Sequence, residues 1–219
     1  MILYVNGDSH SLGVDAGGIP FSYGKHLSDR LNATFICHAY AGGSNDRIIR
    51  TTKNYLKNNT PNLIIIGWST WDREEWFYNN QYYQINSSGH SKLPQELVQK
   101  YKQWVIDEPS TRFDAECRNH QKIWDLHLEL SNKEIPHVFF NTYQYFFNTV
   151  AHQRPKFDWG TNFINPYTEE FTYYYWLQHQ KFKTVSLENY HYGADAQKAW
   201  ADFLIPYLTT VLKDSIITK

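Results

Sequence analysis

The feature that most constrains the fold is a regular alternation of short apolar runs with helix-like patterns along the chain. Apolar runs at residues 2–5, 34–39, 63–67, 137–141 and 183–187 predict five strands. Apolar side chains recur at helical spacing over residues 21–31, 44–56, 113–132 and 167–180, and again in the last segment of the chain. Strands that alternate with helices predict an α/β fold with a mostly parallel five-stranded sheet and helices on both faces.

The length of the chain fits one domain covering residues 1–219. Residues from about 71 to 110 are polar and aromatic, and we expect them to form an irregular, aromatic-rich insertion that carries a helix from Pro94 to Val105. Residues 151–166 have a loop-like composition. We find no internal repeat and no low-complexity linker.

Composition and charge argue against several classes of function. The net charge is -1, and the basic residues are spread along the whole sequence, so we expect no nucleic-acid surface. No apolar run is long enough to span a membrane, and the N-terminus lacks the features of a signal peptide. These observations favour a cytoplasmic protein, and carriage on a larger particle fits them equally well.

We also expect no metal and no cofactor. His120 and His127 lie on one helix face, but no cysteine or carboxylate cluster joins them at ligand spacing. The Gly7 turn has neither a Walker lysine nor a Gly-x-Gly-x-x-Gly pattern, which argues against nucleotide binding. We expect the two cysteines, Cys37 and Cys117, to be buried small side chains without a disulfide, as in proteins of a reducing compartment.

Candidate functional residues follow the predicted strands, because ligands bind beyond the carboxyl ends of the strands in such sheets. Gly7, Asp8 and Ser9 follow the first strand, where Ser9 would lie near a helix N-terminus that stabilises negative charge. These are ordinary turn residues on their own, and Asp8 is expected to hold the turn through local backbone hydrogen bonds.

A second motif follows the last predicted strand, where Glu188 precedes His191 by three residues. A serine nucleophile needs a base, and the base needs an acceptor on its other ring nitrogen. Since the alternating pattern brings both motifs to one edge of the sheet, we expect Ser9 to be the nucleophile, His191 the base and Glu188 the orienting acid.

Together with the Gly42-Gly43 pair and the Tyr192-Gly193-Ala194 start of the last helix, these motifs resemble those of the GDSL or SGNH hydrolases. The resemblance implies a three-layer, flavodoxin-like, doubly wound fold. It also implies that Glu188 takes the place usually held by aspartate. The oxyanion hole would consist of the N–H of Ser9 and the N–H of a glycine in the Gly42-Gly43 pair.

The chain departs from this family in one block. The family pattern after the third strand is Gly-x-Asn-Asp, whose asparagine is a third oxyanion donor, whereas this chain has Gly67-Trp68-Ser69-Thr70. Ser69, Thr70 and Asn45 are the candidate replacements. Trp68 and Trp71 are candidates for either a sugar-stacking surface or the core. Asp72 and Arg73 are expected to form an ion pair at the rim of the site.

Two functions fit these observations. The first is a serine hydrolase that cleaves a carboxylic ester of a small molecule or a glycan, for example an acetyl group on a carbohydrate, through an acyl-enzyme on Ser9. The second is a weakly active or inactive binding or assembly module built on the same fold. The departure after Gly67 fits both functions, and the oligomeric state stays open.

Overall fold

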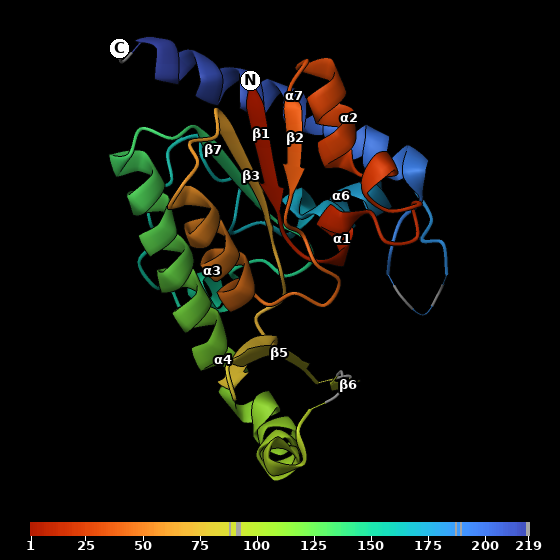
Figure 1. The fold of residues 1–219 in the computed structure, drawn as a ribbon, viewed down its shortest axis with the longest axis vertical. Helices are drawn as coiled ribbons and strands as arrows, with labels where there is room; N and C mark the ends of the chain where they lie inside the picture. Colours follow the sequence, from red (N-terminus) through yellow and green to blue (C-terminus); the bar gives the residue numbers. More distant parts are fainter. Residues whose placement is uncertain (88, 91–92, 187, 189, 218–219) are drawn as a thin grey trace.

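A parallel sheet of four strands forms the centre of the molecule (Figure 1). The computed structural model describes residues 1–87, 89–90, 93–186, 188 and 190–217. Within them the strand order is β2-β1-β3-β7, and every neighbouring pair is parallel. The bounds are β1 Ile2–Asn6, β2 Thr34–Cys37, β3 Leu63–Trp68 and β7 His137–Asn141.

Helices cover both faces of this sheet. On one face, Leu3, Val5 and Ile65 belong to a core cluster that includes side chains of α2 (Tyr23–Arg30), α6 (Tyr173–His179) and α7 (Ala194–Ile217). On the other face, Tyr4 and Ile64 pack with α3 (Asn45–Leu56) and α4 (Gln95–Asn132). This division follows from the two-residue repeat of a strand, which sends successive side chains to opposite faces.

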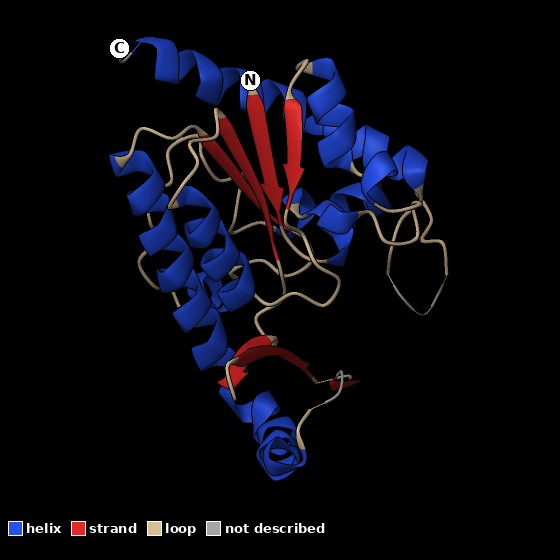
Figure 2. Ribbon diagram, in the orientation of Figure 1, coloured by secondary structure: helices blue, strands red, loops and turns tan. Residues whose placement is uncertain are grey.

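A small antiparallel sheet lies beyond the carboxyl ends of the parallel strands (Figure 2). It consists of β4 Glu74–Tyr78, β5 Gln81–Asn86 and β6 Gly89–His90. The expectation of irregular structure after residue 71 was therefore wrong for this stretch. Asn79 and Asn80 both adopt positive φ angles, 46° and 60°, and join β4 to β5 in a tight hairpin.

The long helix α4 also differs from the prediction of two helices, because it runs without a break through Pro109. Proline removes one helical hydrogen bond and ordinarily kinks or ends a helix. Here the guanidinium of Arg112 makes two hydrogen bonds to the carboxylate of Glu108, at 2.9 and 3.0 Å, and this pair spans the proline on the helix surface.

The predicted fifth strand at residues 183–187 is not part of the four-stranded sheet that the described residues form. Thr184 instead makes an isolated antiparallel bridge with Tyr192, and Leu187 lies outside the described residues. A parallel bridge from Phe163 to Phe139 lies on the β7 side of the sheet. Val185 is 57% exposed, so this segment lacks the burial that an interior strand of a parallel sheet requires.

Four short helices complete the described elements. They are α1 (Ser9–Leu12), α5 (Phe147–Ala151) and two 3₁₀ turns, η1 (Ile19–Phe21) and η2 (Glu169–Phe171). In the described part of the chain, no helix is long and apolar enough to cross a membrane.

Candidate active site

Ser9 begins helix α1 directly after the turn that ends β1. The turn depends on Gly7, whose φ is +156°, because a Cβ at this position would lie 2.1 Å from Ser11 Oγ and 2.8 Å from the Gly67 carbonyl oxygen. The N–H groups in the first turn of a helix have no intrahelical acceptor, so those near Ser9 can bind an anion. Ser9 itself is 5% exposed.

His191 lies beside Ser9, as the sequence predicts for a base. Its Nε2 is 2.9 Å from Ser9 Oγ. The histidine belongs to the loop before α7, and its carbonyl oxygen accepts a hydrogen bond from Val185 N at 2.8 Å. This contact and the bridge from Tyr192 to Thr184 hold the loop in place.

A carboxylate occupies the other side of the His191 ring, and it belongs to Asp15. Asp15 Oδ2 is 3.1 Å from His191 Nδ1. Glu188, which the sequence predicted at this place, is exposed, and its backbone N–H contacts Ser186 Oγ at 3.4 Å. The structure therefore replaces Glu188 with Asp15 as the partner of the histidine.

Asp15 belongs to no sequence motif that would have indicated its contact with His191. It lies in the turn after α1 and adopts a left-handed conformation with φ +63°. Aspartate tolerates this conformation better than most residues, because its short side chain forms local hydrogen bonds. The one available signal was a carboxylate close to Ser9 in a stretch that holds Gly13, Gly17 and Gly18.

Asp8, the residue before Ser9, joins three loops through its carboxylate. Its carboxylate accepts hydrogen bonds from His10 N at 3.0 Å and from Thr142 Oγ1 at 3.1 Å, and Arg73 Nη1 lies 3.3 Å away. The first contact caps α1, as expected from the sequence. The other two join the end of β1 to the segments that follow β7 and β3.

Of the glycine pair after β2, only Gly42 has an unused backbone donor. The N–H of Gly43 donates to the carbonyl of Tyr40 at 2.9 Å. Gly42 adopts a φ of +72°, and its N–H has no acceptor within the residues that the structure describes. The neighbouring Ser44 N–H donates to Gln84 Oε1 at 2.9 Å, so the insertion helps to hold this turn.

Asn45 is fully buried, and its amide is already used. Its Nδ2 donates to the Ser69 carbonyl and to Asn119 Oδ1, both at 3.0 Å, and its Oδ1 accepts from Ser69 N at 2.8 Å. A side-chain amide has two N–H donors. Both are occupied, so Asn45 fixes the backbone after β3 and has no donor left for an oxyanion.

The segment after β3 holds Ser69, Thr70 and Arg73, which lie close to Asp8. Ser69 is buried, and its Oγ accepts a hydrogen bond from Arg73 Nη1 at 2.9 Å; Thr70 is partly exposed beside it. Arg73 pairs with Asp8, so the predicted rim pair with Asp72 was wrong. Asp72 Oδ2 instead lies 3.4 Å from Ser87 Oγ.

The two tryptophans after β3 belong to the core. Trp68 is fully buried and packs edge-to-face on Phe139, with ring centroids 5.1 Å apart. Trp71 is 4% exposed and stacks on Phe146 at 4.8 Å. Trp68 is therefore not positioned for substrate contact, whereas Trp71 lines a cavity next to Tyr143.

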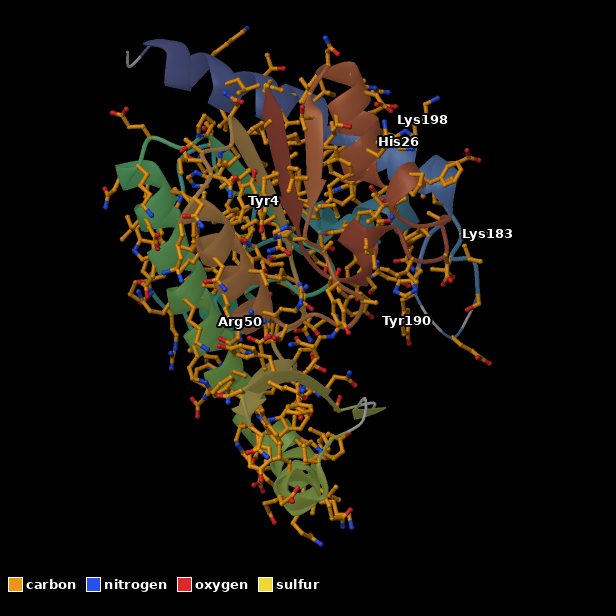
Figure 3. The ribbon with its side chains drawn as sticks, in the orientation of Figure 1. Tyr4, His26, Arg50, Lys183, Tyr190 and Lys198 are labelled. Atoms are coloured by element: carbon orange, nitrogen blue, oxygen red, sulfur yellow. The ribbon has the colours of Figure 1, made fainter. Side chains whose placement is uncertain are left out.

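A group of three tyrosines, the exposed Tyr190 and the half-buried Tyr143 and Tyr174, lies on the side of the histidine loop. Their ring centroids are 4.8 to 5.9 Å apart. Tyr190, which is 51% exposed, precedes His191 on the same loop (Figure 3). A cavity of about 180 Å³ adjoins this tyrosine group and is lined by Tyr143 and Tyr175 among other residues.

His10 lies on the inner side of the site, with its ring centroid 5.1 Å from that of His191. Burial lowers the pKa of His10 to about 4, because the charged form would lose its hydration. His10 therefore stays neutral at pH 7 as a wall of the site.

Among the described residues no group of three or more histidine, cysteine or acidic side chains could hold a metal ion.

The fold resembles that of known structures with the GDSL-type hydrolase fold. TesA matches with a TM-score of 0.54 at 11% identity, covering 96% of this chain and 99% of that chain. An acetyl xylan esterase, AlAXEase, matches with a TM-score of 0.52 at 10% identity, covering 94% and 98%. A protein described as lipolytic, of G-D-S-L family, from Desulfitobacterium hafniense DCB-2 matches at 0.50 and 12%, covering 94% and 99%.

The chain belongs to DUF6071, a family of unknown function, whose model matches residues 5–151. The matched segment contains Ser9, Asp15 and Arg73 and ends before His191. No curated protein matches the chain.

Proposed function

We propose that this protein is a serine esterase that cleaves a carboxylic ester through an acyl-enzyme on Ser9. The observation that carries the proposal is the chain of contacts from Ser9 Oγ to His191 Nε2 at 2.9 Å and from His191 Nδ1 to Asp15 Oδ2 at 3.1 Å. A nucleophile, a base and an orienting acid in hydrogen-bond reach form the arrangement that acyl transfer requires.

In the first half of the reaction, Ser9 Oγ attacks the carbonyl carbon while its proton passes to His191 Nε2. The π electrons of the carbonyl move onto its oxygen, and the N–H groups of Ser9 and Gly42 are the backbone donors for this oxyanion. Asp15 stabilises the imidazolium that forms. The oxyanion then collapses, the C–O bond to the alcohol breaks, and the leaving alcohol takes the proton from Nε2.

In the second half, water attacks the acyl-enzyme and gives its proton to His191 Nε2. The carboxylic acid leaves when Ser9 Oγ takes this proton back. No step needs a cofactor, because each proton that leaves a nucleophile returns to a leaving group through the same ring nitrogen.

For the alcohol part of the substrate we propose a carbohydrate. The tyrosine group beside His191 supports this, because exposed aromatic rings pack against the apolar faces of sugars. The fold similarity to an acetyl xylan esterase is consistent with an acetylated sugar as the substrate.

The test is labelling with a fluorophosphonate probe together with turnover of p-nitrophenyl acetate and acetylated xylan. We expect the folded protein to be labelled on Ser9, and we expect Ser9→Ala to lose labelling and turnover while Ser186→Ala, a serine on the histidine loop, keeps both. Absence of labelling in the folded protein, alongside a control hydrolase that is labelled, would overturn the proposal. Retained binding of the glycan without turnover would then favour the binding module.

A further inference from the structure

The guanidinium of Arg73 contacts Asp8, the residue before Ser9, and Ser69, which stands where the GDSL pattern has an asparagine. We propose that Arg73 donates a hydrogen bond to the oxyanion and so acts as the third, charged donor of the oxyanion hole. This inference rests on the proposed esterase function and adds to it a catalytic residue outside the motifs of the family.

The neutral side chains near this position leave a place for such a donor. Asn45 has both of its N–H groups occupied by Ser69 O and Asn119 Oδ1. The Ser69 hydroxyl oxygen accepts from Arg73, and its single O–H is an uncharged donor, weaker than a guanidinium N–H. The backbone after β3 is thereby fixed by Asn45, and Ser69 in turn positions the guanidinium.

Arg73 still has donors to offer after these contacts. Nη1 supplies the hydrogen bonds to Asp8 Oδ2 at 3.3 Å and to Ser69 Oγ at 2.9 Å. A guanidinium has five N–H donors, and the three on Nε and Nη2 have no acceptor within the part of the chain that the structure describes. The two Nη1 contacts fix the plane of the group, and the other three hydrogens are the donors that the proposal assigns to the oxyanion.

The charges around Arg73 suit this role. Asp8 is 1% exposed and immediately precedes Ser9, while the Arg73 side chain is 22% exposed. Asp8 also accepts from His10 N and Thr142 Oγ1, so its charge is stabilised without a bidentate pair to Arg73. A partly desolvated cation interacts more strongly with a developing negative charge than an amide dipole does.

The test compares Arg73→Ala and Arg73→Lys with the unchanged protein on p-nitrophenyl acetate. Loss of an oxyanion donor lowers kcat by about 10²–10³, so we expect this loss in Arg73→Ala, with KM changed less than about threefold and a smaller loss in Arg73→Lys. Arg30→Ala, which removes a surface arginine paired with Asp202, is the matched control and should keep full activity.

Two further measurements separate a donor from a residue that only positions Asp8. Thr142→Val removes another hydrogen bond to Asp8 but leaves the guanidinium, and it should lower kcat by less than tenfold. Phenylboronic acid forms a tetrahedral anion on a reactive serine, and its inhibition constant should rise in Arg73→Ala by about the factor that kcat falls. The double variant Arg73→Ala/Ser69→Asn restores the amide of the family pattern. Its kcat should be at least tenfold higher than that of Arg73→Ala.

The inference fails if Arg73→Ala keeps kcat within threefold, if it raises KM alone, or if Thr142→Val loses as much as Arg73→Ala. In those cases Ser9 is still labelled by fluorophosphonate, and the esterase proposal stands. If the unchanged protein is neither labelled nor active, both proposals fall together.

Discussion

The contact between Asp15 and His191 predicts a specific response to Asp15→Asn. Asparagine keeps the size of the side chain and tolerates the left-handed backbone at φ +63°, so the turn should stay intact. The substitution removes the carboxylate that accepts the Nδ1 proton at 3.1 Å. His191 would then lose both the support of its reactive tautomer and the stabilisation of its imidazolium.

The size of the effect follows from the burial of the pair. Loss of the acid in a buried triad lowers kcat by about 10⁴. The side chain of Asp15 is 31% exposed and that of His191 is 16% exposed, so water replaces part of the lost interaction. We expect kcat to fall by about 10²–10³, which corresponds to about 2.7–4 kcal/mol of transition-state free energy.

The assay measures kcat and KM for p-nitrophenyl acetate at pH 8, with Glu188→Gln as the paired variant. Glu188 is an exposed acid on the histidine loop, and its substitution should change kcat by less than about twofold. The reasoning is refuted if Asp15→Asn stays within threefold of the unchanged protein while Glu188→Gln loses a hundredfold. Equal melting temperatures of the two variants would show that folding does not account for the difference.

Two further predictions concern stability. Burial lowers the pKa of His10, His120 and His137 to about 4. Below pH 6.5 these histidines therefore bind protons in the unfolded chain but not in the folded chain. We expect the free energy of unfolding to fall by several kcal/mol between pH 6.5 and pH 4 for this reason. Urea titrations at pH 7, 6 and 5 check this, and an unchanged midpoint would contradict it. Asn45→Ala leaves the buried N–H and C=O of Ser69 without partners and should lower the free energy of unfolding by about 2–4 kcal/mol. If this variant keeps its full stability but loses a hundredfold in kcat, Asn45 is an oxyanion donor instead.

Much of the fold was accessible from the sequence because its signals are local. The run at residues 63–67 is apolar up to its closing glycine and predicts a strand covered on both faces, and the structure has β3 there, buried at every position. The hairpin at Asn79 and Asn80 was not predicted, because polar and aromatic residues on β4 and β5 hide the alternation of a strand. The helix through Pro109 was predicted as two helices, because apolar side chains recur at helical spacing only from residue 113 onward.

Some residues of the candidate site could likewise be predicted from the sequence, and others could not. The placement of Ser9 and His191 follows from topology, since both end up at the carboxyl edge of the sheet. Asp15 and Arg73 could not be predicted, because their roles depend on where a loop turns and not on spacing in a motif. The predicted pair of Arg73 with Asp72 assumed contact between sequence neighbours, whereas the guanidinium reaches back to Asp8.

The way the candidate triad is distributed along the chain has a consequence for the newly made protein. Ser9 and Asp15 come from one short stretch, whereas His191 is separated from Ser9 by 182 positions and from Asp15 by 176. During synthesis from the N-terminus, domains fold as their residues emerge. The nucleophile, its acid and the arginine would thus leave the ribosome without a base. The candidate triad would be complete only after residue 191 had been made and had docked beside Ser9.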